Sequence, residues 1–287
     1  MDSGFVRNGA IRLQWRSAGR PDATGPMLLF LHGFPEFSCA WDVMLAHFAP
    51  QYFCVAPDLR GFGGSDRPAE VSAYGPGALM SDIAAVIRHF GRDKAIIIAH
   101  DWGGAIAWGF AARHAAMVEK LIILNAPHAV PFARALAHDA GQQRASHYML
   151  KLRLPGMEDR LREQDAAALA AMFNHPVDGH NVLPPELLAT YRRNWLEPGA
   201  LEAMLNYYRV TPLLPPTPEH AGAAALQLDP AQFKVQVPVL VIWGMKDQRC
   251  CRCCWRASMS WWATCASRGW PGPGIFVRMR RRPVWPP

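Results

Sequence analysis

The chain has 287 residues, 51% of them hydrophobic, which is enough to bury the core of one large domain with an insertion or of two ordinary domains. Its net charge of +7 does not indicate a nucleic-acid or membrane surface, because residues 249–287 hold eight Arg and no Asp, Glu or Lys, which leaves −1 for residues 1–248. Five of the seven Cys also fall in 249–287, a distribution that argues against a disulfide framework. The chain shows neither a signal-peptide pattern nor an uncharged run long enough to span a bilayer, so we expect a cytoplasmic protein.

Short apolar runs alternate with amphipathic stretches along the first half of the chain. Near-continuous hydrophobic segments predict strands buried on both faces of a parallel sheet at 27–33, 52–58, 94–101, 119–125 and 237–244. A more polar ribbon at 10–17 predicts an antiparallel edge strand. Amphipathic patterns predict helices at 38–48, with Ser38 as its N-cap, at 78–90 and at 103–115. This alternation predicts an α/β fold with a mostly parallel sheet flanked by helices.

The alternation stops after residue 127, where helical patterns and proline-rich hinges take over. We interpret residues 128–222 as a helical cap inserted between two strands of the sheet, with 1–127 and 223–248 forming the core. Residues 249–287 form an aberrant tail rich in Cys, Arg and Trp. We therefore expect the last strand and helix of the fold to be absent or irregular.

The stretch IIIAHDWGGAIAW carries the most chemical information. An apolar strand leads through Asp101 into a helix, so Asp101 occupies the tip of a tight strand-to-helix turn between small residues. In such a nucleophile elbow the central side chain stands exposed above the sheet, and a carboxylate there attacks a carbon bearing a strained or good leaving group. The alternative is that Asp101 only caps a helix beginning at Gly103. The strand, the small neighbours and the two glycines favour the nucleophile.

The loop LHGFPE follows the first buried strand. In an elbow fold an amide of this loop, here that of Phe34, pairs with the amide of Trp102 to hold a developing oxyanion. His32 and Pro35 of the same loop are further candidates for the substrate-binding site, and His32 is expected to orient loops through hydrogen bonds or to belong to a simple turn. The Gly-rich loop DLRGFGGSDRP lacks a Walker lysine and dinucleotide spacing, so we interpret it as structural.

The motifs HGFPE, DLRGFGGSDRP and HDWGG together resemble the α/β-hydrolase superfamily, and within it the epoxide hydrolase branch, over residues 10–248. The resemblance implies Asp101 as nucleophile, Asp247 as a second acid that orients a histidine, and two cap tyrosines that bind the epoxide oxygen. The segments HYMLKLRLPG and LNYYRV resemble those that carry these tyrosines, which gives Tyr148 and Tyr208. Two phenols would stabilise and protonate the alkoxide of ring opening. The alternative is that either tyrosine only packs.

Dehalogenases with the same nucleophile are the alternative within the superfamily. Trp102 resembles the halide-binding tryptophan of haloalkane dehalogenases, but these enzymes usually place a polar halide partner where this chain has Phe34. Fluoroacetate dehalogenases, which act on a haloacid, carry Arg around the elbow, where this chain has Trp102 and Ala105. The tyrosines favour an epoxide hydrolase. We expect a small epoxide or halide-bearing organic substrate, no cofactor or metal, and no nucleic-acid or membrane partner; the sequence does not indicate an oligomeric state.

The histidine that ends the family's mechanism, by activating water against the Asp101 ester, has no match in this sequence. All eleven His precede Asp247, and the expected Gly-His-Phe turn after the last strand is not found. His100 adjoins the nucleophile, but neighbours on an elbow point apart. Three histidines of the predicted cap are other candidates for entering the cleft: His128, His147 and His180.

A shift of reading frame after Gln248 is our hypothesis for the tail. With GC-rich codons, reading one base earlier turns residues 250–256 into Leu-Leu-Pro-Val-Leu-Leu-Glu. The same shift turns 270–276 into Val-Ala-Gly-Ala-Gly-His-Phe, which resembles the missing histidine turn. One deleted base would thus explain the excess of Cys, Arg and Trp together with the lost acids and histidine.

Other interpretations of the tail are weaker. The run CCRCC packs four thiols too closely for a tetrahedral zinc site, and GIFVRMRRRPVW imitates a nucleic-acid-binding segment, although a solvated segment without pattern explains it as well. We predict that the chain is alkylated at Asp101 but turns over poorly. The second hypothesis is a non-catalytic remnant that does not fold stably, because loss of the last strand would expose the strand at 237–244 as a sheet edge.

Overall fold

The computed structural model describes residues 1–21, 25–173, 183–244, 247 and 265–270. Its described strands form one sheet in the order β1-β2-β4-β3-β5-β6-β7-β8. The strands are β1 (Asp2–Asn8), β2 (Ile11–Ala18), β3 (Met27–Leu31), β4 (Phe53–Pro57), β5 (Ala95–His100), β6 (Val118–Leu124), β7 (Val239–Gly244) and β8 (Cys265–Trp270). The β1–β2 and β2–β4 pairs are antiparallel and the others are parallel, which confirms the predicted α/β class.

The predicted strands match the observed ones within a few residues, and three of them are buried along their whole length. Every residue of β3, β4 and β5 is buried, as expected for parallel strands covered on both faces. The polar ribbon at 10–17 corresponds to β2, but it is not the edge, since β1 pairs along its outer side. The sequence interpretation missed β1, whose residues are mostly exposed.

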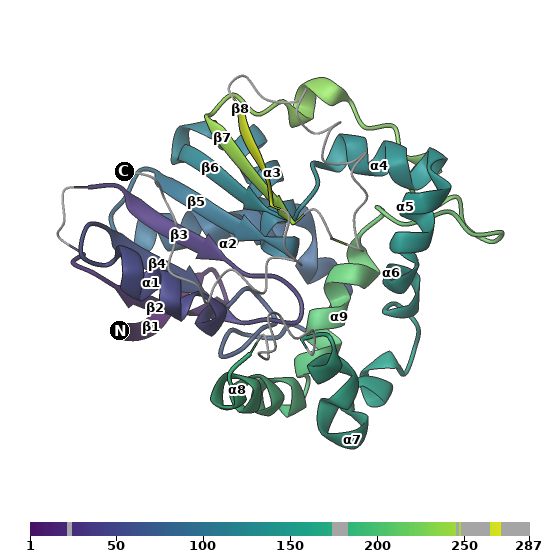
Figure 1. Ribbon diagram of the computed structural model, residues 1–287, viewed down its shortest axis with the longest axis horizontal. Helices are drawn as coiled ribbons and strands as arrows, with labels where there is room; N and C mark the ends of the chain where they lie inside the picture. Colours follow the sequence, from purple (N-terminus) through teal and green to yellow (C-terminus); the bar gives the residue numbers. More distant parts are fainter. Residues whose placement is uncertain (22–24, 174–182, 245–246, 248–264, 271–287) are drawn as a thin grey trace.

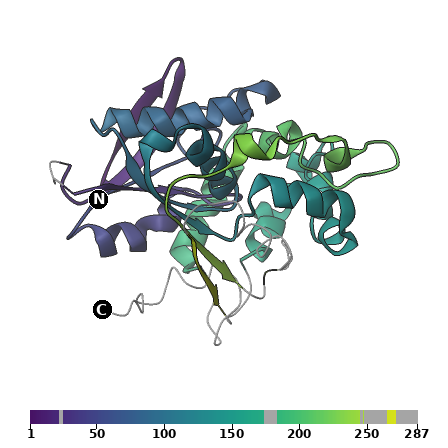
Figure 2. The same cartoon turned by 90° about the horizontal axis from the view of Figure 1, so that it is seen from above.

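Helices cover both faces of the sheet. Figure 2 shows α2 and α3 on one face and α1 on the other. The α-helices are α1 (Asp42–Phe48), α2 (Pro76–His89), α3 (Asp101–Arg113), α4 (Ala129–His138), α5 (Ala140–Ala145), α6 (His147–Lys151), α7 (Met157–Ala171), α8 (Pro185–Leu196) and α9 (Ala200–Val210). Short 3-10 helices span Ser38–Trp41, Val71–Tyr74, Ala115–Met117, Gly222–Ala225 and Pro230–Phe233.

The predicted N-cap at Ser38 is wrong. Ser38 lies inside the 3-10 helix that precedes α1, and its amide donates to Asp58 Oδ1 at 2.7 Å. The Asp58 carboxylate, in the Gly-rich loop, therefore fixes the backbone at the start of this 3-10 helix. The hydrogen bond spans 20 residues, so no local pattern announces it.

The helices α4 to α9 follow β6 and precede β7, and they gather beside the carboxyl ends of the strands (Figure 1). Buried aromatic side chains join this group to the loops below it. Trp195 of α8 donates its indole N–H to the Pro35 carbonyl at 2.8 Å, and Tyr207 of α9 donates its hydroxyl to the Arg60 carbonyl at 2.8 Å. Both rings are fully buried, so the helical layer is firmly packed on the core. The limits 128 and 222 of the cap remain a prediction.

The far edge of the sheet differs from the sequence expectation. β8 pairs in parallel with β7, in a register that runs from Val239 opposite Cys265 to Gly244 opposite Trp270. A strand is thus present where we expected an absent or irregular one, and β7 is not an edge. The helix expected after it would fall in 271–287, which lies outside the described residues.

The strand order creates a natural binding position at one end of the sheet. β3 lies between β4 and β5, so the chain leaves β3 toward one side and later returns on the other. Loops at the carboxyl ends of such neighbouring parallel strands diverge and leave a crevice, where ligands of open α/β sheets bind. The ends of β3 and β5 carry the HGFPE loop and Asp101.

Candidate active site

Asp101 lies at the junction of β5 and α3. Its φ of 50° lies in the left-handed region, which is strained for a residue other than glycine and is concentrated at functional sites. The N-cap of α3 is His100 rather than Asp101, so the side chain of Asp101 is not used as a helix cap. The backbone geometry is therefore that of the expected elbow.

Two glycines allow the loop after β3 to pack directly against Asp101. The Gly103 amide donates to the His32 carbonyl at 2.9 Å, and a Cβ on Gly103 would lie 2.4 Å from the same oxygen. A Cβ on Gly33 would lie 2.3 Å from the Cβ of Asp101. Both distances are far below van der Waals contact. A side chain at position 33 would therefore displace the Asp101 side chain, and one at position 103 would displace the backbone of the loop after β3.

The carboxylate of Asp101 is held by two backbone amides. Phe34 donates its N–H to Asp101 Oδ1 at 2.8 Å, and the amide of Trp102 also favours the ionised carboxylate. Burial nevertheless raises the pKa of Asp101, against the opposing effects of the His100 charge and the two amides. The amides of Phe34 and Trp102, which the sequence analysis assigned to an oxyanion hole, thus point at one carboxylate.

Four aromatic rings gather beside these amides. The Tyr208 ring is buried and meets Phe34 at 5.3 Å, Trp102 at 5.1 Å and Tyr148 at 6.2 Å between ring centroids, each in an edge-to-face arrangement. The ring of Tyr207, its neighbour in sequence, packs on Phe62 and Trp102, but the Tyr207 hydroxyl donates to the Arg60 carbonyl. The structure therefore brings Tyr148 and Tyr208 together and gives Tyr207 a structural role.

Asp247 lies just beyond the carboxyl end of β7. Its carboxylate accepts a hydrogen bond from the side-chain amide of Asn125, and its own N–H donates to the Gly244 carbonyl at 3.0 Å. Asn125 follows β6 with a φ of 44°, and its Oδ1 accepts the Gly244 amide at 2.8 Å. Asn125 was missed by the sequence analysis. An asparagine directly after a buried strand was the available signal, because it can adopt the left-handed turn.

A buried acid–base pair stands behind the nucleophile. Glu36 Oε2 lies 3.2 Å from His100 Nδ1, and Glu36 Oε1 lies 3.5 Å from the Tyr191 hydroxyl. All three side chains are buried. Burial alone would lower the pKa of His100, but the Glu36 hydrogen bond and the charges of Glu36, Asp101 and Asp247 raise it overall. His100 therefore couples electrostatically to both acids of the site, a role that the sequence analysis did not foresee.

His32 and Pro35 make hydrogen bonds that hold the loop after β3 in place. His32 Nε2 accepts the Leu59 amide at 3.0 Å, so Nδ1 carries the proton and donates to the Gly33 carbonyl at 3.0 Å. Burial lowers the pKa of His32, which agrees with a neutral ring. Pro35 is buried and accepts the Trp195 indole through its carbonyl. The geometry matches the expected orienting role of His32.

Of the cap histidines, His128 and His147 do not supply a base to the described site. His128 is the N-cap residue of helix α4, and its Nε2 lies 2.9 Å from the Phe233 carbonyl. Burial lowers the pKa of His128 to about 4. His147 is exposed on α6. His180 lies outside the described residues.

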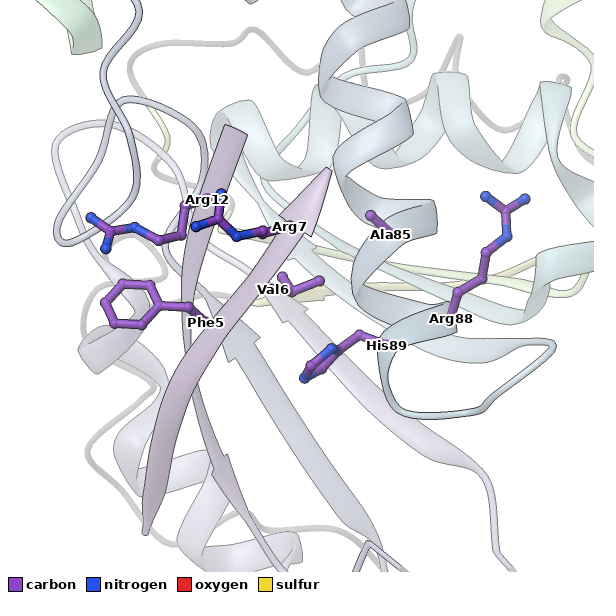
Figure 3. Close-up of a pocket in the computed structure, with 7 residues that line it drawn as sticks. All are labelled: Phe5, Val6, Arg7, Arg12, Ala85, Arg88 and His89. Atoms are coloured by element: carbon purple, nitrogen blue, oxygen red, sulfur yellow. The ribbon is translucent and has the colours of Figure 1, made fainter. Parts of the chain in front are cut away.

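A hollow of about 750 Å³ lies elsewhere, between the β1–β2 hairpin and α2 (Figure 3). Arg7, Arg12 and Arg88 are among its lining residues. Arg12 pairs with Asp66 at 3.6 Å and lies over the Phe5 ring. Charged side chains on the edge strand β1 oppose its pairing with a second chain. None of the residues that line the hollow belongs to the strand ends around Asp101. This hollow is therefore separate from the candidate site.

Within the described ranges, no group of three or more His, Cys, Asp or Glu could hold a metal ion. No helix of the same ranges is long and apolar enough to cross a membrane.

Comparison with known proteins gives consistent matches. A family model described as the alpha/beta hydrolase fold matches residues 26–249. Epoxide hydrolase 3 of Mus musculus is 34% identical over 243 residues, which are 84% of this chain and 62% of that protein. The AB hydrolase superfamily protein YfhM of Bacillus subtilis (strain 168) is 35% identical over 246 residues, 85% of this chain and 81% of that protein.

A solved structure is similar over most of the fold. Bacillus megaterium epoxide hydrolase, crystallised with an inhibitor, superposes with a TM-score of 0.84 at 28% identity, covering 96% of this chain and 94% of that one. The match to the mouse relative spans only about three fifths of that protein's length.

Proposed function

The chain belongs to the α/β-hydrolase family and to its epoxide hydrolase branch, and on this premise we propose that it opens epoxides through an ester at Asp101. The observation that carries the proposal is the carboxylate held by the Phe34 and Trp102 amides next to the paired rings of Tyr148 and Tyr208. A nucleophile and two phenolic acids at one strand end are what ring opening requires. The expected product of complete turnover is a vicinal diol.

Ring opening divides the work between the two sides of the site. The Phe34 amide already donates a hydrogen bond to Asp101 Oδ1, so Oδ2 is the oxygen that attacks the epoxide carbon. The carbon–oxygen bond of the epoxide breaks as the ester bond forms, and the departing alkoxide takes a proton from Tyr148 or Tyr208. The product of this step is a hydroxyalkyl ester of Asp101.

Hydrolysis of that ester requires an activated water. A base would take a proton from the water, whose oxygen attacks the carbonyl carbon of the Asp101 ester, and the Phe34 and Trp102 amides would stabilise the negative charge that forms on Oδ1. Collapse of this intermediate breaks the bond to the ester oxygen, which leaves with a proton as part of the diol, and regenerates the Asp101 carboxylate. Asp247 is the acid that would orient and charge-balance a histidine base. The 287 residues contain no histidine after Asp247, so the ester is expected to accumulate.

The test is mass spectrometry of the intact protein and of the peptide containing Asp101 after incubation with styrene oxide. The expected result is one added substrate mass on Asp101. An unmodified peptide after prolonged incubation would contradict the proposal. Measuring halide release from 1,2-dibromoethane in parallel tests the dehalogenase alternative, which the paired tyrosines disfavour.

The compartment belongs to the same proposal. Cys39 and Cys54 are both free and buried, and burial raises the pKa of each thiol to about 12. Unpaired, unreactive thiols support a cytoplasmic location.

A further inference from the structure

Arg153 joins the two tyrosine-bearing segments. Its Nη1 donates to the Tyr208 carbonyl at 2.7 Å and to the Thr211 carbonyl at 3.1 Å. α9 ends at Val210, so these carbonyls belong to its last turn and to the residue after it. The last carbonyls of a helix lack partners within the helix and attract a cation. Arg153 thus satisfies the end of α9 from a different segment of the chain.

The same arginine is tied closely to Tyr148. Tyr148 lies on α6, and its carbonyl accepts the Leu152 amide at 3.0 Å, while the Arg153 amide donates to Leu150 at 3.3 Å. These bonds continue the helical turn from Tyr148 through Arg153. A fixed Arg153 guanidinium therefore limits how far the Tyr148 backbone can move away from α9.

Other ion pairs join α7 to α9 without touching this turn. Glu158 of α7 accepts from Arg209 of α9 at 2.7 Å, and Arg162 of α7 pairs with Glu202 of α9. They hold the two helices together beyond the α6 turn. Neither pair involves Tyr148 or Tyr208, so Arg162 offers a matched control for loss of an inter-helix arginine.

We infer that Arg153 is a positioning residue, which anchors the Tyr148 turn to the end of α9 and so holds the Tyr148 ring beside that of Tyr208. The inference rests on the proposed function, because it assigns Arg153 an effect on the protonation of the epoxide oxygen. The Tyr208 ring also packs against Phe34 and Trp102, whereas Tyr148 is half-buried and lies on the same turn of chain as Arg153. Loss of Arg153 should therefore act through Tyr148.

The first experiment measures the rate of Asp101 ester formation with excess styrene oxide, by quenched-flow sampling and mass spectrometry. We expect Arg153→Gln to slow ester formation by about 10- to 100-fold, since a displacement of about 1 Å of a reacting group costs up to about 10²-fold. Arg153→Lys, which retains one charged donor, should recover part of the rate. Arg162→Gln should stay within about 2-fold of the parent protein.

The second experiment separates positioning from a general loss of cap stability. Arg153→Gln is combined with Tyr148→Phe, and the two changes are compared singly and together. If Arg153 acts through the Tyr148 hydroxyl, Arg153→Gln slows the Tyr148→Phe protein by less than about 3-fold. The full 10- to 100-fold loss in that background would overturn the inference.

The experiments distinguish failure of the proposed function from failure of the inference about Arg153. If the parent protein forms no ester, the proposed function is wrong and the inference falls with it. If the parent reacts and Arg153→Gln reacts as fast as Arg162→Gln, only the role of Arg153 is wrong. Melting curves for all variants identify any that fail to fold, and Arg153→Lys then replaces Arg153→Gln in the cycle.

Discussion

The two acids of the site stand in contrasting surroundings. Asp101 lies between the loop after β3 and the start of α3, and the Phe34 and Trp102 side chains beside it meet the ring of Tyr208, which in turn meets Tyr148. Asp247 is bonded to Asn125, but the sequence that follows it has no acidic residue and no histidine. In the proposed reaction, the groups that form the ester all precede Gln248, whereas the histidine that hydrolysis would need has no match after Asp247. On the hypothesis of a reading-frame shift after Gln248, only that histidine is lost and the ester-forming groups are kept.

The largest effect should come from the nucleophile itself. Replacing Asp101 by Asn keeps an acceptor for the Phe34 amide but removes the attacking charge, so ester formation should fall by about 10⁴-fold or more. The measurement is the initial rate of adduct formation with styrene oxide. Asp247→Asn is the control, and it should leave this rate nearly unchanged because Asp247 belongs to the hydrolytic half. An equal loss of the ester-formation rate in both variants would contradict the assignment of Asp101 to ester formation and of Asp247 to hydrolysis.

The tyrosines should give the next largest loss. Tyr148→Phe and Tyr208→Phe each remove one proton donor to the epoxide oxygen, and each should slow ester formation by about 10²-fold. Tyr207→Phe is the matched control, since its hydroxyl bonds the Arg60 carbonyl rather than the site. That variant should lose stability without a comparable loss of rate. Unchanged rates in the first two variants would give both tyrosines a packing role.

The Glu36–His100 pair interacts electrostatically with both Asp101 and Asp247. Its loss should lower the free energy of unfolding. The folded-state pKa of His100 is raised above its ordinary 6.5, so the pair's contribution is fully present below pH 6.5 and is lost as pH rises through the folded value. Glu36→Gln should therefore destabilise the fold by about 3 kcal/mol near pH 6, and by less at higher pH. Urea unfolding across pH measures this. Asp66→Asn, which breaks the surface pair with Arg12, should cost about 0.5 kcal/mol or less.

The smallest predicted effect concerns the stability that the fold loses by burying the ionised carboxylate of Asp101. Burial raises the folded-state pKa of Asp101 above the ordinary 3.8, so the native state binds the proton more tightly than the unfolded chain does. Stability is consequently lost as pH rises through the interval between 3.8 and the folded value. Asp101→Asn should raise the melting temperature at pH 7, and this gain should disappear below pH 3.8. A lower melting temperature at pH 7 would contradict it.

The elbow could be predicted from sequence because its determinants are local. A buried strand, Asp101 and two following glycines lie within ten residues, and the turn depends on little else. The Glu36–His100 pair spans 64 positions, and its partners meet only because β3 and β5 are neighbours in the sheet. Such contacts depend on strand order, which hydrophobic patterns do not specify.

The missed and misassigned elements have similar physical causes. Val6 is the one buried residue of β1, so the hydrophobic pattern gives little signal; the Asn8-Gly9 pair, where the chain turns into β2, was the available clue. Ser38 looked like a helix cap, but the Asp58 carboxylate, 20 residues away, fixes its backbone instead. At both places the hydrophobic or capping pattern alone is insufficient: a turn signal marks β1, and a tertiary contact fixes Ser38.

The most direct test of the separation between ester formation and hydrolysis is a time course that follows the Asp101 adduct and diol release in the same sample. The predicted result is a burst of about one adduct per chain that persists while little diol appears. A chain expressed in the alternative reading frame after Gln248 serves as the control, and it should release diol continuously. Sustained diol release by the present chain would contradict the account, because it would require a base that the 287 residues do not place after Asp247.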